Sequence, residues 1–311
     1  MKQLKMQKKR TGHPLAKNVF KYWQLYLMLV PAFTAVFIFH YIPIYGAQIA
    51  FKDYRTSLGI LGSEWVGFKH FIRFLTYPDF WTIMKNTIIL SLYSYLTFPL
   101  SIILALSIDE VQNKKFKKTV QMVTYAPHFV STVIVVSMIN LFFARGSGFI
   151  NTLIANLGVE RIAFLEKQSF FPSLYVWTGV WSGLGWGTIV YLAALSGVSD
   201  DLIEAARIDG AGRMRIIWNI KIPCILPTVI TMLILRTGSL VSVDFEKIYA
   251  MQNPFNLQVS RVISTYVYEL GIQGAQFSYS SAIGLFNNFI NLVLILSVNW
   301  ISKKVSETSL F

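Results

Sequence analysis

The sequence is short of charged residues and has almost no cysteine. Only 14% of its 311 residues are charged, against about 25% in an ordinary soluble domain. Its single cysteine, Cys224, excludes an intramolecular disulfide framework and a cysteine metal site. The four histidines are scattered and have no metal-binding spacing: His13, His40, His70 and His128. We therefore expect no metal site in this chain.

The sequence also lacks the motifs of nucleotide-binding and hydrolytic enzymes. It contains no Gly–Lys pair, so it has no phosphate-binding loop of the GxxxxGKS or GxxxxGKT type, and it has no HExxH or GxSxG motif. Adjacent carboxylates occur at Asp109–Glu110 and Asp200–Asp201, where we expect helix capping to explain them. The chain is predicted to be no enzyme and to hold no cofactor. If ATP drives its function, ATP and Mg²⁺ bind to a partner ATPase.

Long apolar runs dominate the sequence instead. Hydrophobic residues make up 54% of the chain. At a rise of 1.5 Å per residue, about 20 apolar residues cross the ~30 Å hydrocarbon core of a bilayer. We predict an all-α integral membrane protein with six transmembrane helices, at about residues 25–45, 86–108, 120–144, 171–195, 225–243 and 281–301. Pro127 falls inside the third run, where neighbouring helices can tolerate a proline.

Basic residues are unevenly distributed between the two sides of the predicted spans. Residues 1–24 carry seven Lys or Arg and no acidic residue. The segments predicted to lie inside carry seventeen basic residues, and the outer segments carry ten. Because Lys and Arg concentrate in cytoplasmic loops, we predict that both termini are cytoplasmic, with a basic tail at 1–24, a permease domain at 25–305 and a short tail at 306–311. The net charge of +13 is thus explained by topology and does not indicate nucleic-acid binding.

One cytoplasmic segment, residues 198–223, is not built like an ordinary connecting loop. Ser199 is placed to cap a helix whose first turn carries two aspartates, and Gly210 suits the left-handed end of that helix. A second short helix is expected from Arg213 to about residue 220, ended by proline before the next span. Both helices are half apolar, and such exposed apolar surface needs a cover. We interpret residues 198–223 as an elbow that docks on a soluble partner; the alternative is an amphipathic loop in the lipid headgroups.

The elbow resembles the EAA loop of bacterial ABC importer permeases. The family pattern EAA-x3-G-x9-I-x-L-P is matched by Glu204-Ala205-Ala206, Gly210 and Ile220-Lys221-Ile222-Pro223, with a volume-conserving isoleucine in place of leucine. The resemblance implies the MetI-like fold of type I ABC permeases and a multi-pass location in the bacterial cytoplasmic (inner) membrane. It also implies that the elbow couples to an ATPase through Glu204, Ala205, Ala206, Asp209, Gly210, Arg213, Ile220 and Pro223.

The same resemblance implies a set of partners. The chain is expected to pair with a second, different ABC permease subunit in the bilayer. Two ATPase subunits on the inside and an extracellular or periplasmic solute-binding protein on the outside complete the implied complex.

Three predicted spans carry polar or small residues on one helical face. These residues are His128 and Thr132 in the third span, Gly179, Ser182, Gly183 and Trp186 in the fourth, and Gly284, Asn287, Asn288 and Asn291 in the sixth. Amides in hydrocarbon are costly unless they are paired or line a wet cavity. We interpret the three faces as a substrate path, since amides and aromatic rings suit sugar hydroxyls. The alternatives are close helix packing through glycines four residues apart and, for the histidine, an interior side chain with satisfied hydrogen bonds.

Longer stretches resemble the sugar-permease branch of these importers. Residues 20–305 are similar to LplB-type polysaccharide permeases, notably in WVGFKHFIRFL, FWTIMKNT, VDFEKIYAMQNP and VISTYVYELGI. In the related maltose importer, the larger permease binds sugar from the spans that correspond to the fourth and sixth of this chain. The positions that match are Gly179, Ser182, Gly183, Trp186, Gly284, Asn288 and Asn291. The resemblance therefore implies an oligosaccharide substrate.

Arg236 is the one cation inside a predicted span. An intramembrane charge is by default a candidate for function. We expect it to form an ion pair with Asp244 or Glu246, or to extend toward the outer face. The other hypothesis is that it binds an acidic sugar, which makes the substrate a uronate-containing oligosaccharide.

These observations favour one permease subunit of an ATP-driven oligosaccharide importer. A secondary transporter or channel is the first alternative, but such proteins usually carry acidic residues within their spans, and here no Asp or Glu lies there. An ABC permease for another solute, such as a peptide, is the second. A membrane scaffold without transport is the third, and it has no use for polar interior faces.

Overall fold

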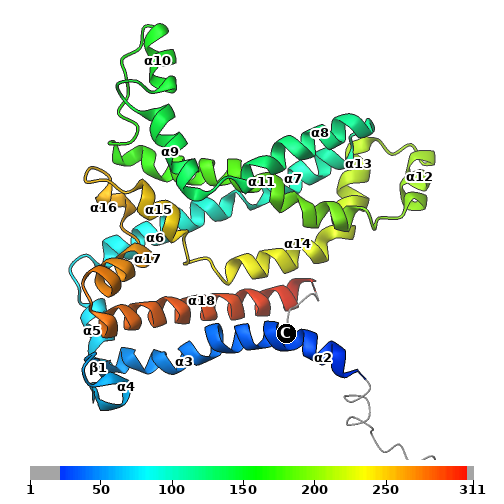
Figure 1. The fold of residues 1–311 in the computed structure, drawn as a ribbon. Helices are drawn as coiled ribbons and strands as arrows, with labels where there is room; N and C mark the ends of the chain where they lie inside the picture. Colours follow the sequence, from blue (N-terminus) through cyan, green and yellow to red (C-terminus); the bar gives the residue numbers. More distant parts are fainter. Residues whose placement is uncertain (1–21, 307–311) are drawn as a thin grey trace, which may run out of the picture.

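The computed structural model describes residues 22–306, which are almost entirely helical. Residues 1–21 and 307–311, which include most of the two predicted tails, lie outside the described residues. The described chain begins with a continuous rod that runs beside α18 (Phe277–Ser306), as Figure 1 shows. The rod consists of α2 (Trp23–Val36), the π-helical turn η1 (Phe37–Tyr41), α3 (Ile42–Gly46) and η2 (Ala47–Phe51). Ala50 is its only buried residue, so its apolar surface is free to contact lipid or a partner.

A small antiparallel sheet follows the rod, and in this detail the all-α prediction is wrong. The sheet pairs β1 (Lys52–Asp53) with β2 (Glu64–Trp65), and the chain reverses between them through α4 (Gly59–Gly62). Lys52 Nζ donates to the Ile60 carbonyl at 2.7 Å and closes the reversal. The strands are two residues long each, too short for a hydrophobic alternation to predict them. Next come α5 (Lys69–Leu75), α6 (Phe80–Leu96) and α7 (Phe98–Asp109).

Four helices of the described chain are long and apolar enough to cross a membrane. They are Trp23–Phe51, Phe80–Asp109, Arg213–Thr237 and Phe277–Lys304, and they overlap the first, second, fifth and sixth predicted spans. The fourth predicted span coincides with α11 (Phe171–Leu195), whose 25 residues have the length of a span. It is not one of the four helices above, and it carries four glycines and two serines besides its apolar residues.

The third predicted span is broken, so the prediction of one helix over 120–144 is wrong. The segment divides into α8 (Lys114–Tyr125) with η3 (Ala126–Phe129), and α9 (Thr132–Phe143), which meet at 98°. Pro127 lies in η3, and Ser131 Oγ then accepts the Ile134 N–H at 3.4 Å and caps a new helix. A proline followed by a good N-cap residue makes two separate helices lower in free energy than one kinked helix. Then α10 (Phe149–Asn156) projects from the rest, and η4 (Gln168–Phe170) leads into α11.

The fifth predicted span, 225–243, starts twelve residues earlier than expected. A continuous helix leads from α13 (Arg213–Ile216) through the π-helical turn η5 (Ile217–Lys221) into α14 (Ile222–Thr237). The second helix of the elbow is therefore the first part of this long helix and not a separate element. Pro223 does not stop the helix, because it lies in the first turn after the wider π-helical turn, where the proline ring meets less crowding.

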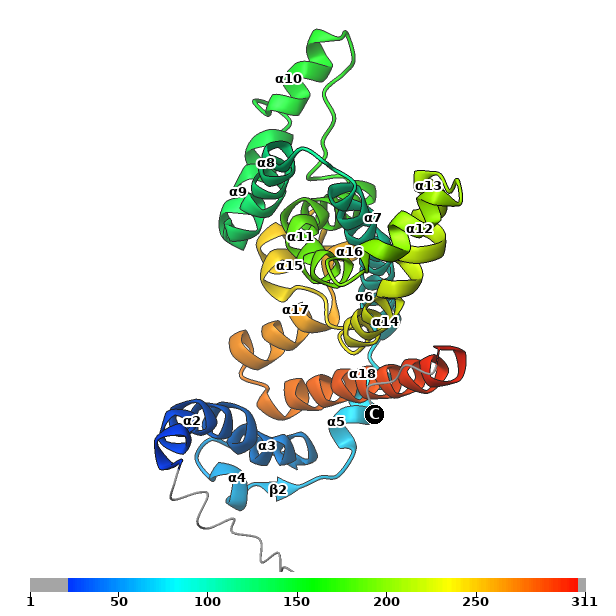
Figure 2. The same cartoon turned by 90° about the vertical axis from the view of Figure 1, so that its right-hand side faces the viewer.

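The two ends of the long helices are occupied by different small elements (Figures 1 and 2). One end carries α5 together with α15 (Phe245–Met251), α16 (Leu257–Ser260), α17 (Ile263–Tyr268) and η6 (Glu269–Gln273). The opposite end carries α12 (Asp200–Ile208), the first helix of the elbow. A buried cluster that includes Phe98, Tyr191 and Ile225 joins α7, α11 and α14 near that end. The elbow thus stands on three packed helices.

Candidate functional site

The elbow has the helix–glycine–helix form that its sequence predicts. Ser199 Oγ accepts the Asp201 N–H at 3.2 Å and caps α12, with two aspartates in its first turn. Gly210 has φ +78°, the left-handed conformation that glycine adopts without strain. The Ala211 N–H then donates to the Ala206 carbonyl at 2.8 Å, which closes the C-terminus of α12. Local sequence signals therefore fix the bend between the two helices.

The elbow presents an apolar surface and free charges. Ile208 is 86% exposed, and Leu202, Met214 and Trp218 are also exposed. The Glu204 carboxylate is exposed and has no ion pair with any residue from 22 to 306. Exposed apolar side chains around a free carboxylate are suited to a groove that offers both an apolar floor and a cation.

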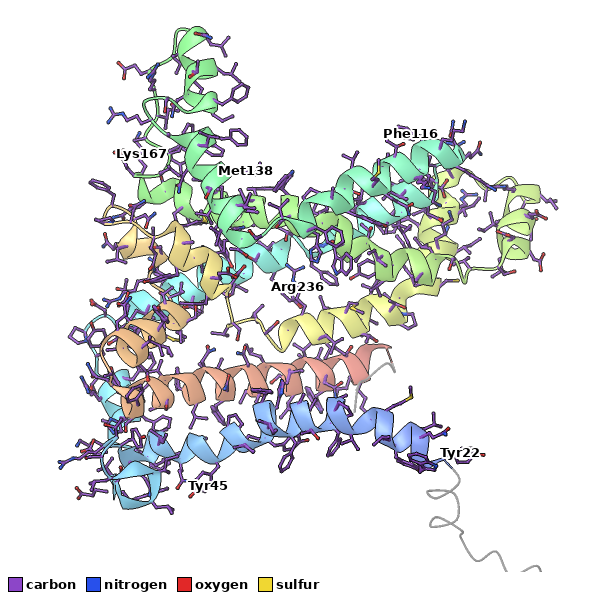
Figure 3. All side chains as sticks on the ribbon, in the orientation of Figure 1. Tyr22, Tyr45, Phe116, Met138, Lys167 and Arg236 are labelled. Atoms are coloured by element: carbon purple, nitrogen blue, oxygen red, sulfur yellow. The ribbon has the colours of Figure 1, made fainter. Side chains whose placement is uncertain are left out.

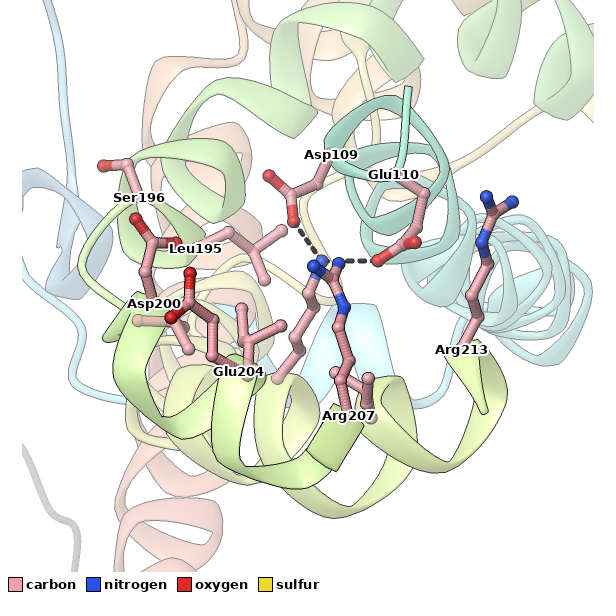
Figure 4. A pocket seen from close by; sticks show the side chains of 12 residues that line it. Asp109, Glu110, Leu195, Ser196, Asp200, Glu204, Arg207 and Arg213 are labelled. Carbon is pink, nitrogen blue, oxygen red and sulfur yellow. Dashed lines mark hydrogen bonds and ion pairs between the residues drawn. The ribbon is translucent and has the colours of Figure 1, made fainter. Parts of the chain in front are cut away.

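A cavity of about 310 Å³ lies between α12 and the helices beneath it (Figure 4). Glu204 and Arg207 line it from the elbow, and Lys221 lines it from the π-helical turn η5. Lys221 Nζ lies 2.6 Å from Asp109 Oδ2 and is also paired with Glu110. Helix capping therefore does not explain Asp109 and Glu110, which end α7 at the C-terminus, where negative charge opposes the helix dipole.

Arg236 lies inside the protein, between α14 and α11 (Figure 3). It is half-buried and lines two neighbouring cavities of about 240 and 160 Å³, which share Ser94 and Tyr175. Its Nη2 donates to the Ser94 carbonyl at 2.5 Å. The expected ion pair with Asp244 or Glu246 does not form, and no carboxylate among residues 22–306 pairs with this guanidinium. The cation beside the two cavities thus forms no ion pair in the described chain, although Asp244 lines the smaller cavity with it.

The glycines of α11 divide into two kinds. Gly179, Gly183 and Gly187 line the larger cavity beside Arg236, and a Cβ on Gly183 meets no atom within 4 Å. Gly185, which is not part of the predicted face, permits close packing against α8, because its Cβ would lie 2.1 Å from the Thr124 carbonyl oxygen. Gly187 permits close packing against α7, because its Cβ would lie 2.7 Å from Ser101 Oγ. Ser182 Oγ donates to the Gly179 carbonyl at 3.1 Å. The four-residue glycine spacing therefore lines a cavity at Gly183 and also brings α11 close to α7 at Gly187.

The histidine of the third predicted span meets the tryptophan of the fourth. The rings of His128 and Trp186 stack at 4.4 Å between centroids, with Phe129 edge-on to the same tryptophan. Both His128 and Trp186 are exposed in the single chain. Thr132 begins α9 directly after the break. The turn that follows Pro127 thus places the rings of His128 and Phe129 against Trp186 of α11.

The polar residues of α18 lie in a different place. Asn291 is buried and holds the linker after α14: it accepts the Val241 N–H at 3.0 Å and donates to Ser242 Oγ at 2.9 Å. Asn288 is exposed, and Asn287 Oδ1 is buried with no hydrogen-bond partner among residues 22–306. A Cβ on Gly284 meets no atom within 4 Å. α14 packs against both α11 and α18, and the described cavity beside Arg236 is lined by α11 and by no residue of α18.

Comparisons with known proteins identify the family. Residues 97–307 match the profile of the binding-protein-dependent transport system inner membrane component. The chain belongs to this family. The permease is 44% identical, over 92% of its length, to the polygalacturonan/rhamnogalacturonan transport system permease YteP of Bacillus subtilis, of which 90% is covered. LplB of the same organism is equally identical over 92% of the permease and 91% of its own chain.

Solved structures support the same assignment. A bacterial ABC transporter for the import of the acidic polysaccharide alginate contains a chain with a TM-score of 0.86 and 38% identity, covering 94% of the permease and 99% of that chain. The predicted resemblance to ABC importer permeases is confirmed, as are the multi-pass inner-membrane location and the non-enzymatic role. The secondary-transporter and scaffold alternatives are thereby set aside.

Two cations that sequence reasoning missed occupy the interior of the permease. Lys247 on α15 is buried, donates to the Tyr175 carbonyl at 2.8 Å and forms no ion pair within residues 22–306. Burial lowers its pKa to about 8. In the sequence, Lys221 stands at a variable position of the EAA pattern and counts among the basic residues predicted to be cytoplasmic. The adjacent acids at the end of a helix were a usable signal for Lys221; no comparable local signal existed for Lys247.

Proposed function

We propose that this permease forms the membrane path of an ATP-driven importer for uronate-containing oligosaccharides. Family membership carries the transport role. The observation that carries the acidic substrate is Arg236, a guanidinium inside the protein that lines two cavities and has no carboxylate partner among residues 22–306. A substrate carboxylate supplies the missing counter-charge in a charge-assisted, bidentate geometry that arginine favours.

The relatives agree with an anionic substrate. YteP is named for polygalacturonan and rhamnogalacturonan, and the structural neighbour imports alginate, an acidic polysaccharide. Galacturonate and alginate chains both carry one carboxylate on each acidic sugar. Ser94, Thr97 and Ser101 line the larger cavity beside Arg236 and offer hydroxyl groups for the sugar. The expected substrate path therefore includes Gly179, Ser182 and Gly183 around the cavity, with His128, Thr132 and Trp186 and the face of α18 (Gly284, Asn287, Asn288 and Asn291) as further contacts on the way.

The proposed topology keeps six spans with both termini cytoplasmic. In it, α8 and α9 together replace the third span, and the elbow and the cluster of α5 with α15–α17 lie on opposite sides of the membrane. The proposed partners are a second, different permease, two ATPase subunits at the elbow and a solute-binding protein at the outer end. The solved alginate transporter is described with a periplasmic protein that carries an alginate pentasaccharide, which supports this assembly.

The proposed mechanism moves the elbow as a lever. Closure of the ATPase dimer pushes α12, whose Glu204 pairs with a basic residue of the ATPase groove. The other contacts proposed for the elbow are Ala205, Ala206, Asp209, Gly210, Arg213, Ile220 and Pro223. Because α13 continues into α14, the push reaches Arg236 along one helix. The cavities around Arg236 then open alternately to the two sides.

Substitution of Arg236 tests the acidic substrate. In the assay, uptake by the complete transporter in proteoliposomes is measured with oligogalacturonate and, separately, with its methyl-esterified, neutral form. A hydrogen bond to a charged group contributes about 1.5–3 kcal/mol, so Arg236→Gln is expected to reduce uptake of the acid by roughly 10- to 150-fold and to spare the ester. Arg236→Lys, which keeps the charge, is the matched control and retains part of the preference. Equal losses for acid and ester, or no loss, contradict the proposal.

A further inference from the structure

Two carboxylates at the end of α7 occupy an unfavourable position unless a cation compensates them. Asp109 is the last residue of α7, and Glu110 follows it. The C-terminus of a helix carries partial negative charge, so each carboxylate there is repelled by the helix as well as by its neighbour. Lys221, more than one hundred residues later, supplies the compensation at 2.6 Å from Asp109 and in direct contact with Glu110.

Lys221 lies where the elbow turns into a span. It is the last residue of the π-helical turn η5, and its side chain is only 8% exposed. A π-helical turn inside an α-helix interrupts the regular hydrogen bonding and often marks a functional position. An unsupported helix is able to bend at this turn and absorb a push from α12. The ion pairs prevent that bend by fixing the turn to the end of α7.

The fixed turn lies directly under the elbow. Asp109, Glu110 and Lys221 line the same 310 Å³ cavity as Glu204 and Arg207 of α12. Figure 4 shows Asp109 and Glu110 across this cavity from Glu204. A third helix is attached more weakly, since Lys117 of α8 lies 3.8 Å from Asp109 and is partly exposed. Two turns before Asp109 in α7, Ser101 lines the cavity beside Arg236. Helices α7 and α14 therefore both lead from this point to the cavity.

We infer that Lys221, Asp109 and Glu110 form a joint that makes α7 move together with α14 when an ATPase pushes the elbow. The inference rests on the proposed function of the elbow. Lys221 acts through helix positions and touches neither nucleotide nor substrate, so it is a positioning residue. Without the joint, the push bends the helix at η5, ATP is still hydrolysed, and α7 stays behind.

A nucleotide-dependent distance measures this movement without any sugar. In a Cys224→Ser background, spin labels replace Ser107 on α7 and Ser297 on α18, both exposed. Pulsed electron paramagnetic resonance compares the complete transporter without nucleotide and after trapping with ATP and vanadate. Wild-type residues at the joint are expected to give a distance shift. The triple variant Asp109→Asn, Glu110→Gln and Lys221→Met removes the joint without leaving one buried charge unpaired, and is expected to lose the shift while it keeps ATP binding.

Matched variants separate a joint from a mere contribution to stability. Lys117→Gln removes only the weaker contact between Lys117 and Asp109, and this variant is expected to keep the full distance shift. Glu110→Gln leaves Lys221 paired with Asp109 and is expected to give a reduced distance shift. If the triple variant does not assemble, Glu110→Gln alone tests the inference. A full shift in the triple variant or in Glu110→Gln, or no shift with the wild-type joint, overturns the inference. Failure of oligogalacturonate uptake in the wild type contradicts the proposed substrate alone, because the distance measurement contains no sugar.

Discussion

Two glycines of α11 are expected to respond differently to an added methyl group, because one has close neighbours and the other faces open space. Alanine at position 185 of α11 places a Cβ 2.1 Å from the Thr124 carbonyl oxygen and 2.4 Å from the Thr124 carbonyl carbon. These are backbone atoms, so no rotamer change relieves the clash, and α8 and α11 have to separate by roughly 1 Å. Alanine at position 183 meets no atom within 4 Å.

The comparison between the two variants isolates the clash. Alanine favours a helix over glycine by up to about 1 kcal/mol, but this gain is the same in both variants and cancels. Overpacking in a well-packed interior typically costs about 1–3 kcal/mol. Gly185→Ala is therefore expected to be less stable than Gly183→Ala by about that amount, which corresponds to a lower melting temperature by roughly 2–4 °C per kcal/mol.

Thermal unfolding of the purified transporter in detergent, followed by tryptophan fluorescence, measures this difference. Equal melting temperatures for the two variants refute the assignment of Gly185 to helix packing. Uptake measures the other half of the argument, because the methyl group of Gly183→Ala enters the cavity beside Arg236. It is expected to slow oligosaccharide uptake at unchanged stability, and normal uptake removes Gly183 from the proposed path.

Two further predictions concern Lys247 and Gly210. The pKa of Lys247 is lowered to about 8 from an ordinary 10.5, so the unfolded chain binds more protons between these values and stability rises with pH from about 8 to 10.5, by at most roughly 3 kcal/mol. Melting temperatures at pH 7 and 9.5 are expected to show this rise in the wild type and not in Lys247→Met; equal slopes contradict an uncompensated buried amine. Gly210→Val places a β-branched residue at φ +78°, which is strained, and is expected to keep ATP hydrolysis while uptake per ATP falls. An unchanged ratio of uptake to hydrolysis counts against the elbow as a lever.

Several features were readable from the sequence because they depend on neighbours along the chain. The cap at Ser199 and the left-handed Gly210 were predicted and are present, since a short side chain and a missing Cβ act within a few residues. The bounds of α11, Phe171–Leu195, were also predicted, because the apolar run starts with a proline that suits the first turn of a helix and ends at a serine and a glycine. Pro127 by itself is compatible with one kinked span. Pro127 together with the helix cap at Ser131 indicates two helices, as the structure has them.

The partners of the interior charges depended on the tertiary structure. Lys221 and the two acids that it neutralises are separated by more than one hundred residues, and no periodicity connects them. Arg236 was expected to pair with the nearest acids in sequence, yet the fold leaves it facing cavities and the Ser94 carbonyl. The glycine spacing of α11 fits packing and cavity lining equally well in the sequence, and only the positions of the neighbouring helices show that Gly185 packs against α8, Gly187 packs against α7 and Gly183 faces open space.

The sequence alone determined the helical membrane class, the elbow and the family to which the permease belongs. These follow from composition, helical period and short-range motifs, whose energies are set within one or two turns of chain. The tertiary structure alone decided which charges are neutralised and which remain free to bind a ligand. Burial and pairing depend on segments that are distant in sequence and meet only when the helices pack.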